Sequence, residues 1–143
     1  MYFNKYNIQT NYSKSQIVEK LKTLTYSDKI PLFRFNFTEK VFHGKINDDT
    51  FSIAQVIKGR NSFIPKINGQ IISGNKNVII IKMRLHYITI LIIAFFTLLI
   101  TWYQLKNFEI GGVIFLLLIY GMTLYFYINE CKKVKNIFEE NFE

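Results

Sequence analysis

Few residues of this chain have the types and spacing that chemistry requires. His43 and His86 are its only histidines, and because they stand far apart with no cluster of cysteine or aspartate, their spacing is not that of a zinc site. A relay from Ser62 through His43 to an aspartate at 48–49 can be drawn, but no nucleophile elbow surrounds the serine. We therefore expect no catalytic residues, no metal and no cofactor, and the sequence favours a protein that is not an enzyme.

The densest pattern of turn-forming and basic residues is the segment 58–69, Lys-Gly-Arg-Asn-Ser-Phe-Ile-Pro-Lys-Ile-Asn-Gly. One interpretation is a structural connection in which Phe63 fills the core of a sheet. The other is a loop that contacts the membrane: Arg60 and Lys66 would bind phosphate, while the aromatic residue and Ile64 would enter the acyl boundary. The residue types favour the structural connection.

Three basic residues, Lys82, Arg84 and His86, alternate with other residues just before a long apolar segment, so they share one face of the strand that we expect there. The simplest interpretation is that their side chains reach lipid headgroups. The alternative is a binding site for an anionic lipid headgroup, in which Arg60 and Lys66 join these three residues. Electrostatic attraction alone contributes ~1 kcal/mol per basic residue near an anionic membrane, which holds a domain there without any pocket.

Two uninterrupted apolar segments, residues 87–105 and 110–128, contain no ionisable residue. At ~1.5 Å per residue, a helix of either length reaches roughly 27–28 Å, about the thickness of a bilayer's hydrocarbon core. Because only residues 106–109 separate them, we expect a transmembrane helical hairpin over residues 87–128.

Basic residues flank the predicted spans at one end of the hairpin. Lys82 and Arg84 precede the first span and three lysines at 132, 133 and 135 follow the second, whereas the tip has Lys106 alone. The positive-inside rule therefore predicts cytoplasmic N- and C-termini for a multi-pass protein of the bacterial inner (plasma) membrane. The single cysteine, Cys131, fits a reducing compartment.

Outside the apolar segments, hydrophobic periodicity predicts an α+β fold: a small cytoplasmic domain over residues 1–86 with a β-α-β start followed by a meander. Ser13 and Gln16 have the spacing of a capping box before an amphipathic helix at 14–23. Period-two alternation and aromatic content predict the strands. These are residues 2–9, 33–37, 41–46, 51–57, 67–72 and 78–85.

For residues 129–143 the sequence predicts a cytoplasmic amphipathic helical tail that continues the second span. Val134, Ile137, Phe138 and Phe142 recur at helical spacing, and such an apolar stripe needs cover. The β domain of the same chain is the simplest cover, and the domain of a neighbouring chain is the alternative.

Residues 40–128 resemble a family of small, uncharacterised bacterial membrane proteins. The motifs that carry the likeness are Phe-x-Gly-Lys-Ile at 42–46, Phe-x-Ile at 51–53 and Arg-Asn-Ser-Phe-x-Pro-x-Ile-x-Gly at 60–69. In that family a β-rich segment precedes a basic step and a pair of membrane helices, so the resemblance implies the same order of parts here. It implies no activity.

These observations predict a non-enzymatic integral membrane protein that serves as a regulatory or scaffolding module. Its partners would be the lipid bilayer and either further copies of the chain or another membrane protein. The alternative is a protein that binds or modifies an anionic lipid headgroup through a basic membrane-facing surface. The net charge of +8 also suits nucleic acid, but the lysines are spread through every element and the bilayer already accounts for the charge.

Overall fold

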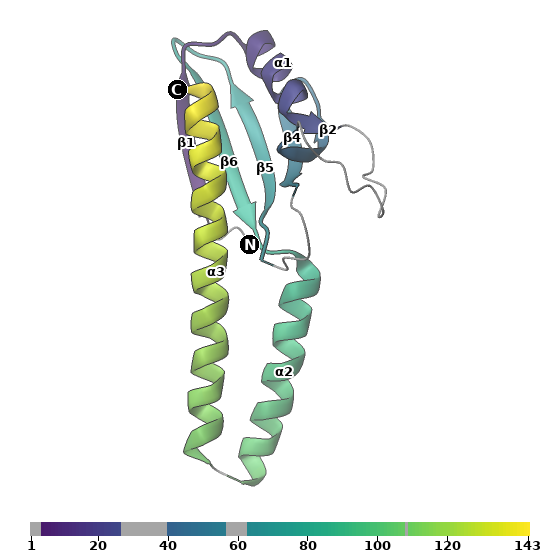
Figure 1. The fold of residues 1–143 in the computed structure, drawn as a ribbon, viewed down its shortest axis with the longest axis vertical. Coiled ribbons are helices and arrows are strands. Elements are labelled where there is room, and N and C mark those ends of the chain that lie inside the picture. Colours follow the sequence, from purple (N-terminus) through teal and green to yellow (C-terminus); the bar gives the residue numbers. More distant parts are fainter. Residues whose placement is uncertain (1–3, 27–39, 57–62, 108) are drawn as a thin grey trace.

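The computed structural model describes residues 4–26, 40–56, 63–107 and 109–143. Within these residues the chain forms one six-stranded sheet and three helices (Figure 1), which confirms the predicted α+β class. The helices are α1 (Lys14–Leu24), α2 (Tyr87–Lys106) and α3 (Ile110–Phe142). The strands are β1 (Asn4–Thr10), β2 (Thr25–Tyr26), β3 (Phe42–Ile46), β4 (Thr50–Gln55), β5 (Lys66–Ile72) and β6 (Asn77–Arg84).

The sheet has the strand order β1-β6-β5-β4-β3-β2. Strands β3 to β6 follow one another as antiparallel neighbours, β1 pairs antiparallel with β6, and β2 pairs parallel with β3. The strands predicted at 41–46, 51–57, 67–72 and 78–85 are therefore present, with several ends shifted by one or two residues. The strand predicted at 33–37 lies outside the described residues.

In the sequence, helix α1 connects β1 to β2, and these two strands form the opposite edges of the sheet. It begins with the predicted capping box: Ser13 Oγ accepts from the backbone N–H of Gln16 at 3.3 Å, and Gln16 Oε1 accepts from the backbone N–H of Ser13 at 2.8 Å. Its apolar residues Ile17 and Leu21 are fully buried. The strands that precede and follow the helix are thus not neighbours, and the helix crosses the sheet.

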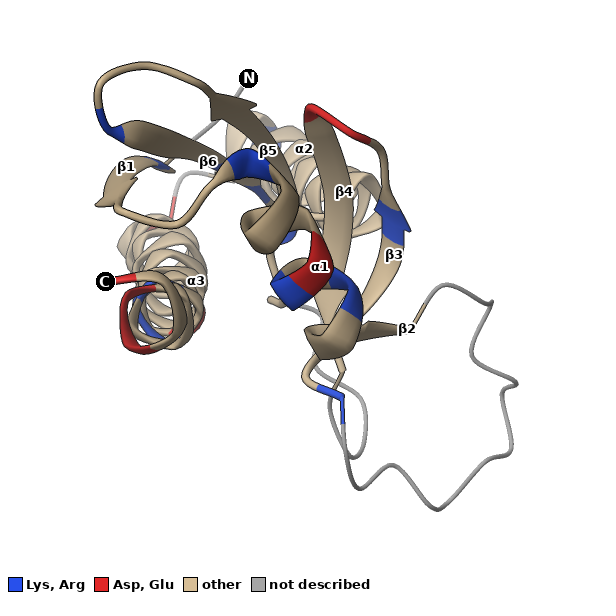
Figure 2. Ribbon diagram, turned by 90° about the horizontal axis from the view of Figure 1, so that it is seen from above, with Lys and Arg blue, Asp and Glu red and all other residues tan. Residues whose placement is uncertain are grey.

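The two faces of the sheet differ in their surroundings. One face packs against α1 and the C-terminal half of α3, which lie on the same side of the sheet (Figure 2). Alternate strand residues point into this core, among them Ile53, Ile67, Ile79 and Ile81, each at most 1% exposed. The opposite face bears polar and basic side chains at the intervening positions, and we call it the open face.

Helix α3 continues without interruption from the predicted second span into the core of the sheet. Its buried apolar residues recur every three or four positions and are Tyr127, Cys131, Val134, Phe138 and Phe142. The ring of Phe138 meets Phe42 on β3 at 5.4 Å and Phe51 on β4 at 5.9 Å between centroids. In this structure the apolar stripe of the tail is therefore covered by the sheet of the same chain.

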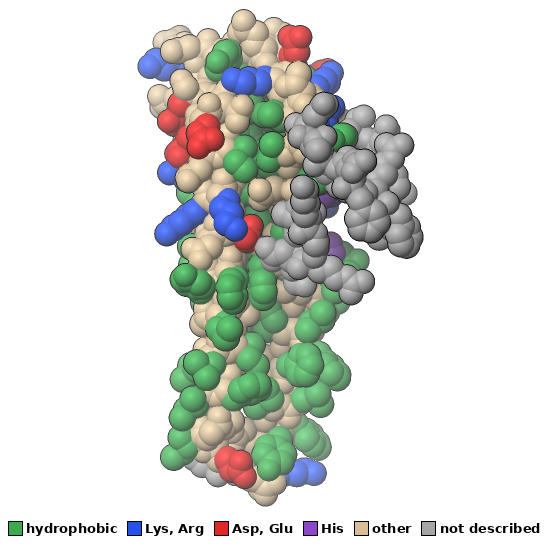
Figure 3. All heavy atoms as spheres, viewed as in Figure 1, with side chains coloured by type: hydrophobic (Ala, Val, Ile, Leu, Met, Phe, Trp, Pro, Cys, Tyr) green, Lys and Arg blue, Asp and Glu red, His purple; other side chains and the backbone are tan. Residues whose placement is uncertain are grey.

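Helix α2 and the first half of α3 run side by side, away from the sheet (Figure 1). Thr97 Oγ1 and Tyr120 OH form a hydrogen bond between the two helices at 2.8 Å. At the tip, the Gln104 side chain accepts from the backbone N–H of Glu109 at 2.8 Å and donates to its carbonyl oxygen at 2.7 Å. Apolar side chains cover this pair on the side seen in Figure 3. Both helices are long and apolar enough to cross a membrane.

Candidate functional site

The strand register gathers polar and basic side chains of the open face into two rows. The row nearer to α2 contains His43, Ala54, Lys66 and Arg84. The other row contains Lys5, Lys45, Ser52, Asn68 and Lys82. Successive residues on one face of a strand are about 7 Å apart, so the two rows lie about that far from each other.

The open face is strongly positive, because the strands contribute five cations in these two rows and no acidic residue. None of the six described strands contains aspartate or glutamate. In the turn between β3 and β4, the Asp49 carboxylate pairs with Lys14 of α1. A surface of one charge sign concentrates ions of the opposite sign, so this face attracts anions.

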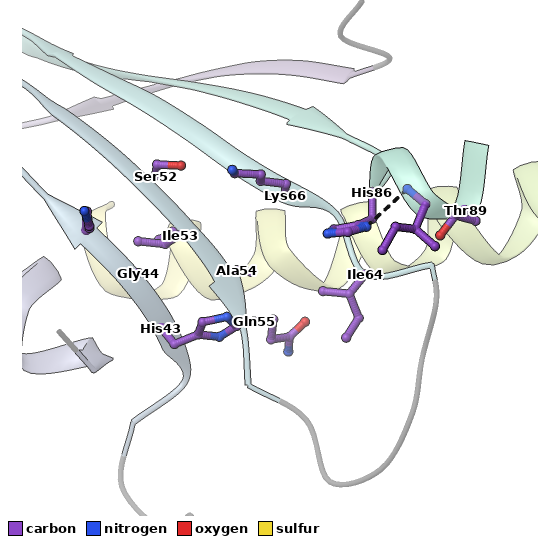
Figure 4. A pocket seen from close by; sticks show the side chains of 12 residues that line it. His43, Gly44, Ser52, Ile53, Ala54, Gln55, Ile64, Lys66, His86 and Thr89 are labelled. Atoms are coloured by element: carbon purple, nitrogen blue, oxygen red, sulfur yellow. Dashed lines mark hydrogen bonds between the residues drawn. The ribbon is translucent and has the colours of Figure 1, made fainter. Parts of the chain in front are cut away.

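A cleft of about 590 Å³ opens at the end of the open face that adjoins α2 (Figure 4). We call it the basic cleft. Its lining includes Lys45, Ser52, Lys66 and His86, together with the apolar Ile64 and Ile88. These residues come from β3, β4, β5, the segment before β5 and the start of α2. The volume falls within the range of small-molecule sites, about 300–1,000 Å³.

His86 connects the basic cleft to the beginning of α2. Its Nδ1 accepts a hydrogen bond from the backbone N–H of Ile88 at 3.4 Å, the dashed line in Figure 4, and it is the N-cap residue of the helix. An imidazole whose Nδ1 accepts a hydrogen bond carries its proton on Nε2. While His86 caps the helix, it therefore presents an N–H donor on its other edge.

His43 and Gln55 bring unpaired polar atoms to the same cleft. His43 Nδ1 and Gln55 Oε1 are buried, and neither has a hydrogen-bond partner within the described part of the chain. Burial lowers the pKa of His43, so its ring is neutral at pH 7 with one donor and one acceptor nitrogen. A buried polar atom without a partner costs about 1–3 kcal/mol, and such atoms mark places where water or a ligand group binds.

A second cleft of about 380 Å³ follows the row that contains Lys82. Lys45 and Ser52 line both clefts, so the two are adjacent. Ser52 Oγ donates to Asn68 Oδ1 at 2.8 Å, which ties β4 to β5 across this row. An anion at the basic cleft is therefore close to cations of both rows.

The structure brings together several residues that the sequence predicts for a headgroup site. Lys66 and His86 line the basic cleft, and Arg84 is directly opposite Lys66 in the register of β5 and β6. Lys82 lines the second cleft. Arg60 lies outside the described residues.

Sequence reasoning did not identify His43, Lys45 and Ser52 as site residues. The first two alternate on β3, and the serine is on β4 directly opposite Lys45. The alternation within each strand was a usable signal that these side chains share a face. Only the pairing of β4 with β5, however, brings them beside Lys66.

The two residues predicted to contact the membrane lie partly against the protein. The ring of Phe63 stacks on Phe126 of α3 at 5.6 Å between centroids and packs against the core cluster. Ile64 is half-buried and lines the basic cleft. Because Phe126 belongs to the apolar half of α3, this segment lies at the level where the apolar helices meet the sheet.

No protein-family model, curated protein sequence or solved structure matches this chain. The resemblance of residues 40–128 to small bacterial membrane proteins therefore stays a prediction. Among the described residues, no group of three or more histidines, cysteines, aspartates or glutamates is placed to hold a metal ion. The polar groups that the described residues offer a ligand at this site are mainly cations and N–H donors, because the Ser52 hydroxyl already donates to Asn68.

Proposed function

We propose that this protein is an integral membrane protein whose two apolar helices cross the bilayer and whose sheet acts as a regulatory or scaffolding module at the surface, without enzymatic activity. The exposure of the two helices carries the proposal. Only 6% of the most apolar window of α2 and 11% of that of α3 are buried, whereas a helix of a soluble core buries an apolar face. Exposed apolar surface costs about 25 cal/mol per Å² in water, and lipid removes that cost.

The lengths of the helices support the same placement. The 20 residues of α2 reach ~30 Å, the thickness of a hydrocarbon core. The 33 residues of α3 reach ~50 Å, which suffices for a span and for the cover of the sheet beyond it. Trp102 lies near the tip with the Lys106 ammonium 5.3 Å from its ring centroid, a pair typical of the headgroup level.

Two connections without a flexible linker support the role of a fixed module. Only Leu85 and His86 separate β6 from α2, and Leu85 is buried. The other connection is α3 itself, which enters the core as one helix. A sheet attached in this way keeps a constant height above the membrane and a constant orientation, so it always presents the same face to a partner. We infer that the partner is a second copy or another membrane protein, that the membrane is the bacterial inner membrane, and that both termini are cytoplasmic.

A second candidate function, binding of an anionic lipid headgroup, is favoured by the charge of the open face. The row of cations nearer to α2 lies next to the proposed membrane boundary, and none of the described strands contributes an acidic residue to offset it. Headgroup binding and a scaffolding role are compatible, because a bound lipid would further fix the sheet at the surface.

Labelling of single cysteines with a membrane-impermeant maleimide tests the membrane placement, in a Cys131→Ala background. Leu98 is 70% exposed in the middle of α2, and Lys76 is exposed in the turn between β5 and β6. In native membranes Leu98→Cys should resist labelling until detergent unfolds the protein, whereas Lys76→Cys should react in inverted vesicles and Glu109→Cys in spheroplasts. Equal labelling of Leu98→Cys and Lys76→Cys in intact membranes would overturn the proposal.

Native mass spectrometry of the protein released from native nanodiscs tests the proposed role. A defined homo-oligomer or a co-purifying membrane protein would support the scaffolding module. A monomer that carries one stoichiometric anionic lipid would favour the second candidate function instead.

A further inference from the structure

We propose that the basic cleft binds the phosphate of an anionic lipid headgroup whose acyl chains lie beside α2. The inference rests on the proposed membrane placement, and it gives the second candidate function a ligand class and a set of binding residues. These residues are Lys45, Lys66 and His86 as the main donors, with Ser52 and His43 beside them.

The end of the basic cleft next to α2 lies at the proposed level of lipid phosphates. Arg84 and Tyr87 are three residues apart, so the row of Lys66 and Arg84 stands at most about 10 Å above the first residue of α2. The headgroup layer on each side of the hydrocarbon core is about 5–8 Å thick. His86 therefore lies at the base of this layer, and Lys66 lies at or just above its upper limit. Lys45, in the row about 7 Å farther from α2, would reach the layer through its extended side chain.

The polar lining of the basic cleft suits a phosphate group. Lys45 and Lys66 supply two ammonium groups, and in Figure 4 the Lys66 side chain extends towards Ser52, at the end of the cleft away from α2. His86 supplies an Nε2–H donor at the other end, next to α2. A phosphate oxygen accepts several hydrogen bonds from different directions, and bonds from charged donors are the stronger ones. His43 Nδ1 adds a buried atom that has no partner in the described part of the chain.

The apolar part of the lining indicates a lipid. Ile64 and Ile88 line the same cleft, and Thr89 extends it along the first turn of α2. Apolar groups next to the helix and cations farther up the sheet reproduce the order of acyl chain, glycerol and phosphate in a lipid. A soluble phosphate ester would have no use for the apolar wall.

The sheet register is a further observation that favours an anionic ligand. Lys66 is directly opposite Arg84 in the antiparallel pair of β5 and β6, and like charges at such positions repel each other. No acidic residue of the described strands lies between them or beside them on this face. A phosphate group at Lys66 would relieve this repulsion.

The test is native mass spectrometry of the full-length protein ejected from phosphatidylcholine nanodiscs that contain increasing fractions of phosphatidylglycerol. The quantity measured is the fraction of phosphatidylglycerol at which half of the protein retains one anionic lipid. At ~0.5 M ammonium acetate diffuse attraction is screened within a few ångström, so retention should persist only for a specific site. Lys66→Gln and Lys45→Gln should each raise the half-occupancy fraction about tenfold, as expected for the loss of one charged hydrogen bond.

Lys76→Gln is the matched control, because it removes the same charge from the exposed turn between β5 and β6. It should leave lipid retention unchanged. Equal loss in Lys76→Gln and Lys66→Gln, or no retention at high salt, would overturn the site. If millimolar glycerol phosphate displaced the lipid, the ligand would be a soluble phosphate ester and the lipid assignment would be wrong. Failure of the protein to enter nanodiscs would refute the membrane placement itself, which separates the two proposals.

A second variant guards against an effect on folding. His43→Leu removes the unpaired Nδ1 from the cleft, so the unfolding midpoint should stay equal or rise while lipid retention falls. A lower midpoint with unchanged retention would remove His43 from the binding site.

Discussion

Replacing Phe138 by alanine tests whether the tail of α3 is part of the sheet core. The side chain is only 1% exposed, and its ring meets those of Phe42 and Phe51 at 5.4 and 5.9 Å between centroids. It also stacks on Phe142 at 5.7 Å. Two of these neighbours stand on β3 and β4, whose backbones are paired along their length, so they have little freedom to fill the cavity that alanine would leave.

The expected loss of stability is about 3–5 kcal/mol, the range for a buried phenylalanine replaced by alanine. A value near the upper end is expected, because each aromatic pair adds ~0.5–1.5 kcal/mol beyond the buried area. Small domains have a total stability of about 5–15 kcal/mol, so the expected loss is a large fraction of the free energy of unfolding. Since every 1.4 kcal/mol is about a factor of ten, opening of the sheet should become about 100-fold more frequent or more.

Hydrogen–deuterium exchange of the full-length protein in nanodiscs measures this opening. Amides of β3 and β4 should exchange about 100-fold faster in Phe138→Ala than in the wild type. Phe115→Ala is the control, because it makes the same change on the same helix at a residue that is 54% exposed in the apolar half. If β3 and β4 exchanged at the same rate in both variants, the tail would not contribute to the core and the reasoning would be refuted.

Two further predictions concern the sheet itself. Gly69→Ala should destabilise it by about 1–3 kcal/mol, because a Cβ at this position would overlap the ring of Phe51. Gly74→Ala is the control: its Cβ would lie 3.4 Å from the nearest atom, so the change should be neutral. The midpoints of denaturant-induced unfolding compare the two variants. Burial lowers the pKa of His43 in the folded protein, so the unfolded chain takes up this proton first and stability is lost as the pH falls through about 6.5 and below. His43→Gln should abolish that part of the loss, and identical pH profiles of the unfolding midpoint for wild type and variant would contradict it.

Local periodicity was enough to predict the elements that bury a single face. In β6, Ile79, Ile81 and Met83 alternate and are fully buried, and the stripe of α3 follows from its helical spacing. Pairing between distant segments is not a local property. The alternation of residues 4–10 does not indicate that β1 lies beside β6, and β2 is too short to alternate at all.

The same distinction explains which site residues were predictable. Lys66 was identified from the density of basic and turn-forming residues in segment 58–69, and His86 from its closeness to the predicted span. Both signals can be read along the chain. His43 and Lys45 are far from the span in sequence, and their place at the cleft depends on the order in which β3, β4 and β5 pair. Knowledge of that order requires the three-dimensional structure.

The distribution of charge on the strands is best explained by an anionic partner. Lys5 is directly opposite Lys82, and Lys66 is directly opposite Arg84, so two antiparallel pairs place like charges against each other at a cost in stability. A solvated sheet face would gain from opposite charges at these positions. An anionic membrane surface attracts basic residues by ~1 kcal/mol each, but only within about a Debye length, so it acts on the row of Lys66 more than on that of Lys82. A phosphate in the basic cleft would act directly at Lys66. In Figure 1 the strands run along the same axis as α2 and α3, so only the end of the open face next to α2 lies near the proposed membrane boundary. The like-charge pair at that end, Lys66 and Arg84, therefore favours the proposed phosphate in the basic cleft.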